Sequence, residues 1–365
     1  MRILAVVPSI LDTSPGQRYR LEQWDPYLRK SGVEITYEPF ECQELHSLVY
    51  RPGSFMRKVG LVSRAFLRRW RLLDRLQEFD AVYIFREAAL LGPAILEQRI
   101  NRLGPPIIFD FDDAIFIRYR SPSNGYLSYL KFAGKTQSIC RMAAHIIVGN
   151  SYLADYAKQF NPRVSVIPTT IDTDKYKVER KNGKAIPVIG WTGSFSTVQH
   201  LDTLRGALSR LARSERFRLR VIGTSTYTLE GVEVEASKWC AATEIEELSE
   251  IDIGIMPLPD EPWSRGKCGL KALQFMALGL PTVCSPVGVN TDIIQDGENG
   301  FIASSEDEWI RKLSLLLNSP LLRGKIGNAA RATVVDRYSA HTQAPRFFQV
   351  LDSVVRSSKS FTPET

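Results

Sequence analysis

Two lysines stand four residues apart at the start of a predicted helix. Lys267 and Lys271 flank Gly269 and Leu270, and the apolar helical pattern that follows stops at Gly279. This spacing places both ammonium groups on one side of the helix entry, where the first backbone N–H groups have no partner within the helix. Cations and free amides together can hold a diphosphate. A capped helix with solvated lysines explains the segment equally well.

A second candidate anion site lies in the loop after the first predicted strand. Residues 8–20 are rich in Ser, Thr and Pro, and they contain Gly16, Arg18 and Arg20. Such a loop can present backbone N–H groups to a phosphate. Taken alone it favours an ordinary turn, because neither G-x-G-x-x-G nor G-x-x-x-x-G-K-[ST] is present. The missing motifs also argue against a dinucleotide oxidoreductase and a P-loop nucleotide hydrolase.

The hydrophobic pattern predicts a scaffold of alternating strands and helices. The predicted strands are residues 3–7, 33–37, 81–85, 106–109, 145–148, 164–167, 187–191, 218–222, 252–256 and 282–284. The predicted helices are residues 18–30, 54–78, 88–102, 126–143, 198–213, 269–278, 306–317, 321–336 and 340–355. Several strands are apolar throughout, as expected when helices cover both faces of a parallel sheet. The order predicts an α/β fold with two Rossmann-like domains.

A polar stretch that contains glycine separates the two halves. We expect an N-terminal domain at residues 1–172, a linker at 173–186, a C-terminal domain at 187–338 and a final helix at 339–357. Ligands of such sheets bind at the carboxyl ends of the strands. The substrates are therefore expected in a cleft between the two domains.

The composition excludes several classes of protein. The chain has 365 residues, of which 44% are hydrophobic and 24% charged, as in a globular protein of two domains. No apolar run reaches the roughly 18 residues of a membrane-spanning helix, and the apolar N-terminus is interpreted as a strand, not a signal peptide. Five scattered cysteines and four histidines without metal-ligand spacing indicate a reducing cytosol, and neither a disulfide framework nor a zinc site is expected.

Positive charge is concentrated in the first half. The net charge is +7, and residues 1–175 hold 24 Lys and Arg against 18 Asp and Glu. Within this half, residues 55–76 predict a helix with an apolar stripe beside a basic one. The apolar stripe is formed by Phe55, Val59, Val62, Phe66, Trp70 and Leu73. The basic stripe is formed by Arg57, Arg64, Arg68, Arg71 and Arg75.

This helix has two interpretations. It could bind an anionic membrane surface, or it could pack on the core with its basic face solvated. Nucleic acid is not an expected partner, since no reading motif accompanies the charge.

The second half carries the motifs of a known family. Residues 269–281 have the order Gly-Leu-x3-Gln-x-Met-Ala-x-Gly-x-Pro, followed by Ser-Pro-Val-Gly-Val-Asn at 285–290 and Asp-Gly-Glu-Asn-Gly-Phe at 296–301. Val-Ile-Pro at 166–168 and Ile-Gly-Trp-Thr-Gly-Ser at 189–194 agree with them. In combination these motifs resemble glycosyltransferase family 4, most strongly over residues 145–340.

The resemblance implies the GT-B fold, with two Rossmann-like domains facing across a cleft and a C-terminal helix returning to the first domain. It implies a retaining glycosyltransferase that moves a sugar from a nucleotide-diphosphate donor, a UDP- or GDP-sugar, to a saccharide or lipid-linked acceptor. The expected pathway is cell-surface polysaccharide or glycolipid synthesis, in the cytoplasm or on the inner face of the plasma membrane. No metal or other cofactor is implied, because protein cations and helix ends stabilise the departing diphosphate.

The match has gaps at the family's functional positions. The two glutamates that the family carries eight positions apart fall on Gly266 and Gln274. The Arg and Lys that hold its diphosphate fall on Ser194 and Gln199. A catalytically inactive binding subunit and a sugar-nucleotide epimerase with the same fold are therefore the alternative functions.

Other cations must replace the missing pair if the protein is active. Lys267 and Lys271 are the expected catalytic cations, and Arg265, Arg18 and Arg20 are further candidates. Gln274 would bond a ribose hydroxyl without carrying a charge. The expected donor-binding residues are Gly16, Arg18, Gly193, Ser194, Arg265, Gly269, Leu270 and Gln274.

Charged residues in the first half follow two predicted strands. Asp110, Asp112 and Asp113 follow the strand at 106–109. They could orient an acceptor hydroxyl, with Asp112 and Asp113 as catalytic residues, or cap a helix. A D-x-D metal site of the GT-A type is the third interpretation, and it conflicts with the second Rossmann-like half.

Arg86 and Glu87 follow the strand at 81–85 in an equivalent place. They are expected either to contact the acceptor or to form a buried pair with each other.

Overall fold

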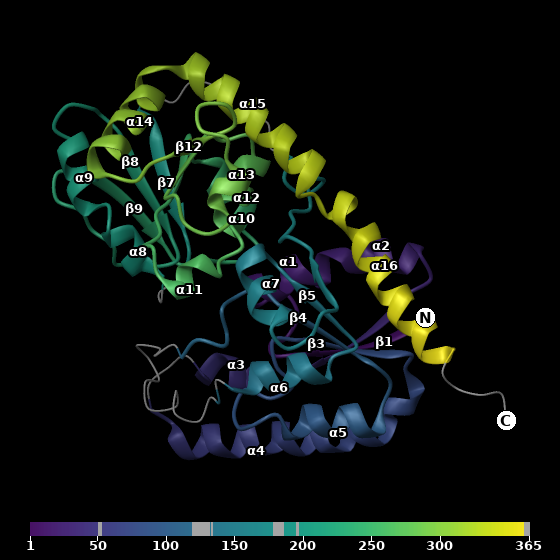
Figure 1. Ribbon diagram of the computed structural model, residues 1–365. Coiled ribbons are helices and arrows are strands. Elements are labelled where there is room, and N and C mark those ends of the chain that lie inside the picture. The colour runs from purple at the N-terminus through teal and green to yellow at the C-terminus, as the bar shows by residue number, and fades with distance from the viewer. Residues whose placement is uncertain (50–52, 119–131, 133, 178–185, 195–196, 361–365) are drawn as a thin grey trace. The chain divides into compact units, whose positions relative to one another are not determined.

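The computed structural model describes residues 1–49, 53–118, 132, 134–177, 186–194 and 197–360. It divides into two compact units (Figure 1). Unit 1 comprises Met1–Pro168 and Gln343–Thr365, and unit 2 comprises Thr169–Thr342. Residues 178–185 of the expected linker lie outside the described residues, as does most of 126–133 at the start of the helix predicted at 126–143.

Unit 1 is built on a parallel sheet of six strands in the order β2-β1-β3-β4-β5-β6. The strands are β1 (Arg2–Val7), β2 (Glu34–Pro39), β3 (Ala81–Phe85), β4 (Ile107–Phe111), β5 (His145–Val148) and β6 (Val164–Val166). Every residue of β3 and β4 is buried, as their apolar sequences predict for a sheet covered on both faces. Phe85 pairs with Asp110, so both strands deliver the residues that follow them to the same edge.

The helices of unit 1 are shorter than predicted. They are α1 (Pro15–Arg20), the 3-10 turn η1 (Glu22–Trp24), α2 (Asp25–Lys30), α3 (Gln43–Val49), α4 (Phe55–Leu72), η2 (Leu73–Glu78), α5 (Ile95–Leu103), α6 (Gly134–Met142) and α7 (Ser151–Lys158). The helix predicted at 18–30 is divided into three, since Pro26 suits the start of a helix and not its interior. The helix predicted from 88 begins at Ile95, after Gly92 at a φ of +83°.

The last helix, α16 (Ala340–Lys359), belongs to unit 1 from Gln343 onward. Its Phe347 ring lies 4.6 Å from the Trp24 ring and 5.6 Å from the Tyr83 ring, measured between centroids. These buried aromatic contacts fasten the helix to the first sheet. The expectation that the final helix returns to the first Rossmann-like fold is confirmed.

Unit 2 contains a second parallel sheet of six strands, in the order β12-β11-β10-β7-β8-β9. The strands are β7 (Val188–Thr192), β8 (Arg218–Ile222), β9 (Glu233–Ser237), β10 (Ile253–Met256), β11 (Thr282–Cys284) and β12 (Phe301–Ile302). The helices are α8 (Val198–Asp202), α9 (Arg205–Leu211), α10 (Glu244–Ser249), α11 (Pro262–Arg265), α12 (Leu270–Ala277), α13 (Asn290–Ile293), α14 (Glu306–Asn318) and α15 (Pro320–Arg337). Two parallel sheets with interleaved helices confirm the predicted α/β class.

The core-facing side of α4 differs from the predicted apolar stripe. The buried positions are Lys58, Leu61, Ala65, Arg69 and Leu72. Arg69 donates hydrogen bonds of 2.9 and 2.8 Å to the carbonyl oxygens of Ala88 and Val7, and burial lowers its pKa to about 9. A basic side chain thus faces inward because loop carbonyls need a donor there.

The predicted apolar stripe lies largely outside. Phe55, Val59 and Trp70 are 56%, 44% and 42% exposed, whereas the Phe66 ring lies 5.4 Å from the buried Phe40 ring. Packing on the core therefore accounts for only part of this stripe. Among the described residues, none of the helices combines the length and the apolar character needed to cross a bilayer.

Candidate functional site

The start of α12 in unit 2 is an uncapped helix end. Gly269 at its N-cap has a φ of +71°, and a Cβ there would lie 2.4 Å from Ile293 Cδ1, so glycine is required. No side chain caps the helix, and no acidic residue stands in its first turn. The first backbone N–H groups, including that of Leu270, therefore have no side-chain acceptor within the helix.

The two predicted lysines stand at this helix end, each over an aromatic ring. Lys271 Nζ lies 4.7 Å from the centroid of the Trp191 ring, and Lys267 Nζ lies 5.2 Å from that of Trp263. Trp191 is fully buried at the end of β7. The contact between Lys271 and Trp191 connects α12 with the carboxyl end of the sheet, where ligands of such folds bind.

Gly193 and Ser194 follow β7 beside the same tryptophan. A Cβ on Gly193 would lie 2.3 Å from Cη2 of Trp191, so the absence of a side chain lets the backbone pass over the ring. The Ser194 backbone N–H donates to Thr197 Oγ1 at 3.0 Å, which shapes the turn into α8. Gly193 and Lys271 therefore both lie against the buried indole of Trp191, whereas Lys267 lies over the ring of Trp263.

His200 joins this group, and sequence reasoning missed it. It lies on α8 and is only 5% exposed. Burial, with the ammonium groups of Lys271 and Lys267, lowers its pKa to about 4. The imidazole is therefore neutral at pH 7, the form that the two nearby cations favour. The available signal was a histidine six residues after Ser194, in the helix that follows the first strand of unit 2.

Arg265 is engaged on the surface. It is half exposed, and its guanidinium donates to both carboxylate oxygens of Asp260 at 2.7 and 3.1 Å. This bidentate pair lowers the pKa of Asp260. The expectation that Arg265 holds a diphosphate stays a prediction, and it requires this pair to open.

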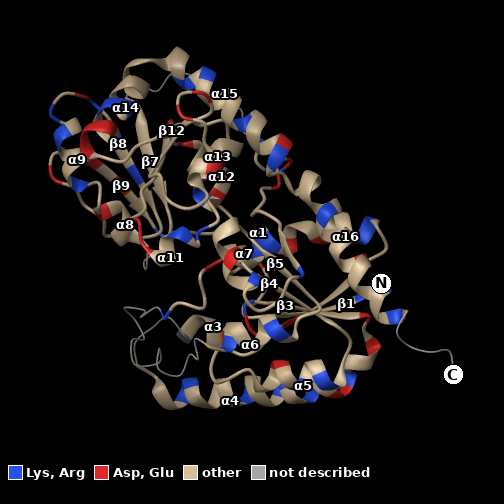
Figure 2. Cartoon of the chain, in the orientation of Figure 1, with Lys and Arg blue, Asp and Glu red and all other residues tan. Residues whose placement is uncertain are grey.

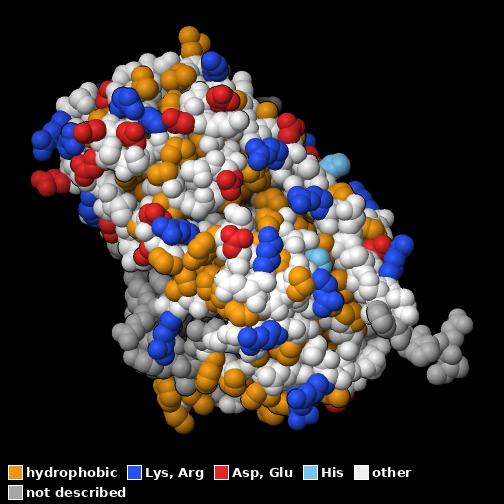
Figure 3. All heavy atoms as spheres, in the orientation of Figure 1, with side chains coloured by type: hydrophobic (Ala, Val, Ile, Leu, Met, Phe, Trp, Pro, Cys, Tyr) orange, Lys and Arg blue, Asp and Glu red, His pale blue; other side chains and the backbone are white. Residues whose placement is uncertain are grey.

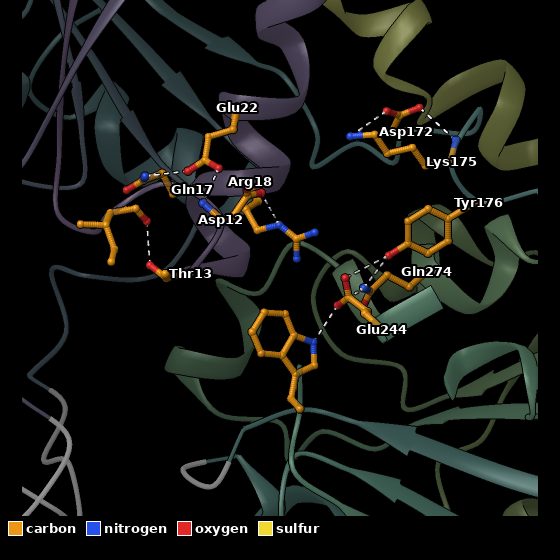
Figure 4. A network of polar contacts seen from close by, with 12 residues as sticks. Asp12, Thr13, Gln17, Arg18, Glu22, Asp172, Lys175, Tyr176, Glu244 and Gln274 are labelled. Carbon is orange, nitrogen blue, oxygen red and sulfur yellow. Dashed lines mark hydrogen bonds and ion pairs between the residues drawn. The ribbon is translucent and has the colours of Figure 1, made fainter. Parts of the chain in front are cut away.

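Gln274 is the centre of a buried hydrogen-bond network in unit 2 (Figure 4). Its Nε2 donates to Tyr176 Oη at 3.0 Å and to Glu244 Oε1 at 2.9 Å. Glu244 also accepts from the indole N–H of Trp239 at 2.9 Å. Both Gln274 and Glu244 are 3% exposed. A ribose bond to Gln274 stays a prediction, and the network supplies a carboxylate, that of Glu244, beside this amide.

In unit 1, three charged side chains meet at the ends of β3 and β4. Arg86 Nε donates to Asp112 Oδ1 at 2.7 Å, and Arg86 Nη2 donates to Asp113 Oδ2 at 2.8 Å. Arg86 has a φ of +60°, a strained backbone for a long side chain, which is typical of functional sites. Glu87 lies 3.6 Å from Lys135, so Arg86 finds its partners in the aspartates and not in the adjacent glutamate.

The other interpretations of these aspartates fit less well. Residues 112–118 form turns, so neither Asp112 nor Asp113 caps a helix within that segment. No group of three or more His, Cys, Asp or Glu side chains is arranged to hold a metal in the described part of the chain. Orientation of an acceptor group by these aspartates stays a prediction.

The loop after β1 borders this cluster. Arg18 Nε lies 3.5 Å from Asp12 Oδ1, a residue that itself has a φ of +62° (Figure 4). A Cβ on Gly16 would lie 2.7 Å from Arg86 Nη2 and 2.8 Å from Asp112 Oδ2. The structure therefore brings Gly16 to the charged cluster of unit 1, whereas the sequence assigned it to the donor.

Asp110 and Arg20 form a sealed ion pair beneath this surface. Neither side chain is exposed, and Arg20 Nη2 donates to Asp110 Oδ1 at 2.7 Å. Tyr83 Oη donates to Asp110 Oδ2 at 2.6 Å. Burial raises the pKa of Asp110 despite the adjacent guanidinium. The expectations that Asp110 lines the acceptor side and that Arg20 contacts a phosphate are wrong, because the two side chains are fully buried and pair with each other.

Comparison with known proteins assigns both halves of the chain. The family profile described as Glycosyltransferase Family 4 matches residues 26–175, and the profile described as Glycosyl transferases group 1 matches residues 186–319. The chain is a glycosyltransferase of the family 4 type. No curated protein matches it by sequence.

Solved glycosyltransferases share the fold over almost the whole chain. Sucrose-phosphate synthase from Thermosynechococcus elongatus has a TM-score of 0.73 at 14% identity, covering 98% of this chain and 100% of that one. A glycosyltransferase from Rickettsia africae has a TM-score of 0.68 at 16% identity, covering 98% and 99%. Anabaena HepE, solved with UDP and glucose, has a TM-score of 0.65 at 16% identity, covering 97% and 100%. At these identities the likeness shows the GT-B fold alone.

Gly16→Ala tests the unit 1 cluster of this glycosyltransferase. The new methyl group must displace the Arg86 guanidinium or the Asp112 carboxylate. We expect transfer to an acceptor to fall at least about tenfold, because small misplacements of positioning groups are costly. Donor hydrolysis without an acceptor should be unchanged.

The matched control is Gly134→Ala, where a Cβ meets nothing within 4 Å. Both rates are measured by mass spectrometry of the sugar products. Equal acceptor kinetics for the two variants would refute a role for the cluster in positioning the acceptor.

Proposed function

We propose that this enzyme transfers a sugar, with retention of configuration, from a nucleoside-diphosphate sugar to a saccharide or lipid-linked acceptor in polysaccharide or glycolipid synthesis. The observation that carries the proposal is the convergence of Lys267, Lys271 and the uncapped start of α12 at the end of β7. Anabaena HepE was solved with UDP-glucose, which supports a UDP-sugar as the first donor to test.

The chemistry follows from where charge develops. When the bond between the sugar and the diphosphate breaks, the leaving oxygen gains negative charge. In the proposed mechanism, Lys271, held over the Trp191 ring, and the backbone N–H groups at Gly269 and Leu270 stabilise that charge without reorganisation. The protein's own cations fill this role in the proposed mechanism, so no metal or cofactor is needed.

The acceptor is assigned to unit 1. Asp112 and Asp113 each accept a hydrogen bond from Arg86. A carboxylate has acceptor sites for more than one hydrogen bond, so we assign these two groups to the binding of a sugar hydroxyl.

A screen of nucleotide sugars tests the proposal. The purified protein is incubated with UDP-, GDP-, ADP- and dTDP-sugars, and products are identified by mass spectrometry and chromatography. Donor hydrolysis or transfer supports the enzyme. If the donor is instead epimerised in the absence of an acceptor, the proposed transferase activity would be replaced by an epimerase activity.

One specific observation favours a second function, a non-catalytic nucleotide-sugar-binding subunit. Gly266, Gln274, Ser194 and Gln199 stand where the resemblance places the family's two glutamates and two cations. Binding measured by calorimetry, with no turnover in the same screen, would establish this second function.

We further propose that α4 brings the enzyme to an anionic membrane. The helix carries several basic residues (Figure 2), and hydrophobic side chains lie along the same edge of unit 1 (Figure 3). The exposed apolar residues are Phe55, Met56, Val59, Leu67 and Trp70. At about 100° per residue, Arg64 and Arg71 fall about 100–140° round the helix from Val59 and Trp70, and all four residues are exposed. Apolar insertion with flanking cations suits an anionic lipid surface.

Charge reversal tests this surface. The double variant Arg64→Glu with Arg71→Glu should lose at least about tenfold in partitioning to vesicles of equal phosphatidylglycerol and phosphatidylcholine, since each basic residue near such a surface contributes about 1 kcal/mol. Co-sedimentation measures the bound fraction. The control is Arg99→Glu with Arg102→Glu on α5, an exposed basic pair of the same unit. An equal loss of vesicle binding in the two double variants would exclude a specific role for α4. Equal binding of the wild type to the mixed vesicles and to pure phosphatidylcholine would exclude it as well.

A further inference from the structure

Residues 86–89 form a buried loop that carries Arg86 into the charged cluster of unit 1. Arg86 follows β3 with a φ of +60°, and its backbone N–H donates to the Asp110 carbonyl oxygen at 2.7 Å. Ala88 and Ala89 are 0% and 2% exposed. Loops usually lie on the surface, where water satisfies their backbone groups. This buried loop must therefore find its hydrogen-bond partners inside the protein.

Charged side chains from three helices supply those partners. Lys135 of α6 donates from Nζ to the Ala89 carbonyl oxygen at 2.7 Å. Oε1 of Glu97 on α5 accepts from the Ala88 N–H at 2.9 Å. Arg69 of α4 donates from Nε to the Ala88 carbonyl oxygen at 2.9 Å. The backbone of both buried alanines is thus held by side chains from other elements.

Two of these side chains also pair with each other. Lys135 Nζ lies 3.1 Å from Glu97 Oε1 and 3.6 Å from Glu87 Oε2. The side chains of Lys135 and Glu97 are 5% and 0% exposed. The other carboxylate oxygen of Glu97, Oε2, is buried and has no hydrogen-bond partner among the described residues. Burial of such a pair costs free energy that the attraction does not always offset, so stability alone does not explain these residues.

A neutral side chain satisfies backbone groups elsewhere in unit 1. Asn161 Nδ2 donates to the carbonyl oxygens of Cys140 and Ala143 at 3.0 and 2.7 Å, and its Oδ1 accepts from the Arg163 N–H at 3.0 Å. One amide therefore serves three backbone groups without a charge. The charged pair at the buried loop does more than this, because its attraction also holds α5 and α6 against the same loop.

The strained backbone of Arg86 is what such a support would maintain. A long side chain at positive φ costs free energy, and it persists only where the surrounding structure holds it in several ways. Arg86 stands between β3 and the two held alanines, which leaves its backbone little room to relax. In this conformation its guanidinium bonds to Asp112 and Asp113. A relaxed backbone at residue 86 would turn the guanidinium away from these carboxylates.

We propose that Lys135 and Glu97 are positioning residues for the acceptor: they hold residues 87–89 so that Arg86 keeps its left-handed backbone and its two aspartate partners. The inference rests on the proposed function, because that function assigns the acceptor to the charged cluster of unit 1. Neither side chain touches the acceptor in this proposal. Their loss should therefore impair the use of the acceptor and leave the donor step intact.

Lys135→Met tests the position of Arg86, because it removes the donor to Ala89 with a side chain of similar length. NMR of the full-length protein follows the Arg86 Nε–H signal, which is identified by its loss in Arg86→Lys and reports the bond to Asp112. We expect this proton to exchange with solvent at least about tenfold faster in Lys135→Met than in wild type, because the bond opens more often.

A second variant keeps the test available if Lys135→Met does not fold. Lys135→Met leaves the Glu97 carboxylate buried without its partner, which is strongly destabilising. The double variant Lys135→Met with Glu97→Gln leaves no fully buried charge of this pair, and the glutamine oxygen still accepts from Ala88. It should recover part of the stability but not the slow exchange of Arg86, since Ala89 still lacks its donor.

Kinetics test the consequence for the acceptor, with the donor found in the screen and octyl glycosides as acceptor probes. Lys135→Met should lower kcat/KM for the acceptor at least about tenfold, and donor hydrolysis without an acceptor should stay within about twofold of wild type.

The matched control is Lys312→Met in unit 2. Lys312 is also a buried lysine, and it lies 2.9 Å from Asp296 and donates to the Ile302 carbonyl oxygen. The control should lose comparable stability and change neither the Arg86 signal nor the acceptor kinetics.

The outcomes separate this inference from the proposed function. An unchanged Arg86 signal in Lys135→Met would overturn the positioning role and leave the proposed function standing. An equal loss of acceptor kinetics in Lys312→Met would also overturn it, because any loss of stability would then have the same effect. Faster exchange of Arg86 with wild-type acceptor kinetics would remove the acceptor from this cluster, and the inference would fail with that assignment. If no donor is turned over, the proposed function fails and the inference fails with it.

Discussion

Lys271→Ala should reduce kcat/KM for donor turnover by about 10²–10³-fold. The reason is that the ammonium group acts on charge that develops at the leaving diphosphate, and removing one such preorganised donor typically costs about 3–4 kcal/mol of transition-state stabilisation. The ground-state complex should weaken less than the transition state, so the loss is expected mainly in kcat.

Folding should tolerate this change. Lys271 contacts Trp191 at 4.7 Å, a contact between cation and ring that contributes at most about 1–2 kcal/mol to the free energy of unfolding. The control variant is Lys325→Ala, an exposed lysine of the same unit on α15. Steady-state kinetics with the donor found in the screen gives kcat and KM for all three proteins. Wild-type kcat in Lys271→Ala would remove this lysine from the proposed mechanism.

Arg20→Met should lower the free energy of unfolding by about 3–5 kcal/mol. The substitution removes the guanidinium that compensates Asp110, and a buried carboxylate left without its partner is strongly destabilising. The Tyr83 hydroxyl remains as a single donor to Asp110. Chemical denaturation followed by circular dichroism measures the change, with the slope against denaturant checked for two-state behaviour.

Two comparisons establish that the loss comes from burial. Arg356→Met breaks an exposed pair with Asp352, in which the arginine side chain is 80% exposed, and it should cost less than about 1 kcal/mol. Adding Asp110→Leu to Arg20→Met removes the orphaned charge and should restore part of the stability. A double variant no more stable than Arg20→Met would show that the cost comes from lost packing and not from an unpaired charge.

The burial of Asp110 shows that a position at the end of a strand does not by itself predict an exposed side chain. Asp110, Asp112 and Asp113 follow one another in sequence, and all three stand at or beyond the carboxyl end of β4. Side chains alternate between the two faces of a strand, and a residue still paired within the sheet points into a covered face. Asp110 is in register with Phe85 and is buried, whereas Asp112 and Asp113 have left the ladder and meet Arg86.

The α4 helix likewise shows that the spacing of apolar residues does not by itself predict which face of a helix is buried. Apolar residues three to four positions apart identified the helix, but two adjacent stripes of residues on this helix have that spacing. Packing selected the stripe that contains Lys58 and Arg69, and the long Arg69 side chain reaches the carbonyl groups of Ala88 and Val7. The exposed part of the apolar stripe is the surface that we propose binds a membrane.

The sequence by itself determined the fold class and the lysine pair at α12, because strand–helix alternation and helix-end signals depend on neighbouring residues. It did not predict β9 and β12, which lie at the sheet edges; β9 alternates polar and apolar residues, and β12 is two residues long. Only the tertiary structure decided that Arg20 pairs with Asp110, that Gln274 donates a hydrogen bond to Glu244, and that His200 lies near the lysines. Each of these relations joins segments 30 or more residues apart, and such contacts leave no local pattern when both partners are ordinary polar residues.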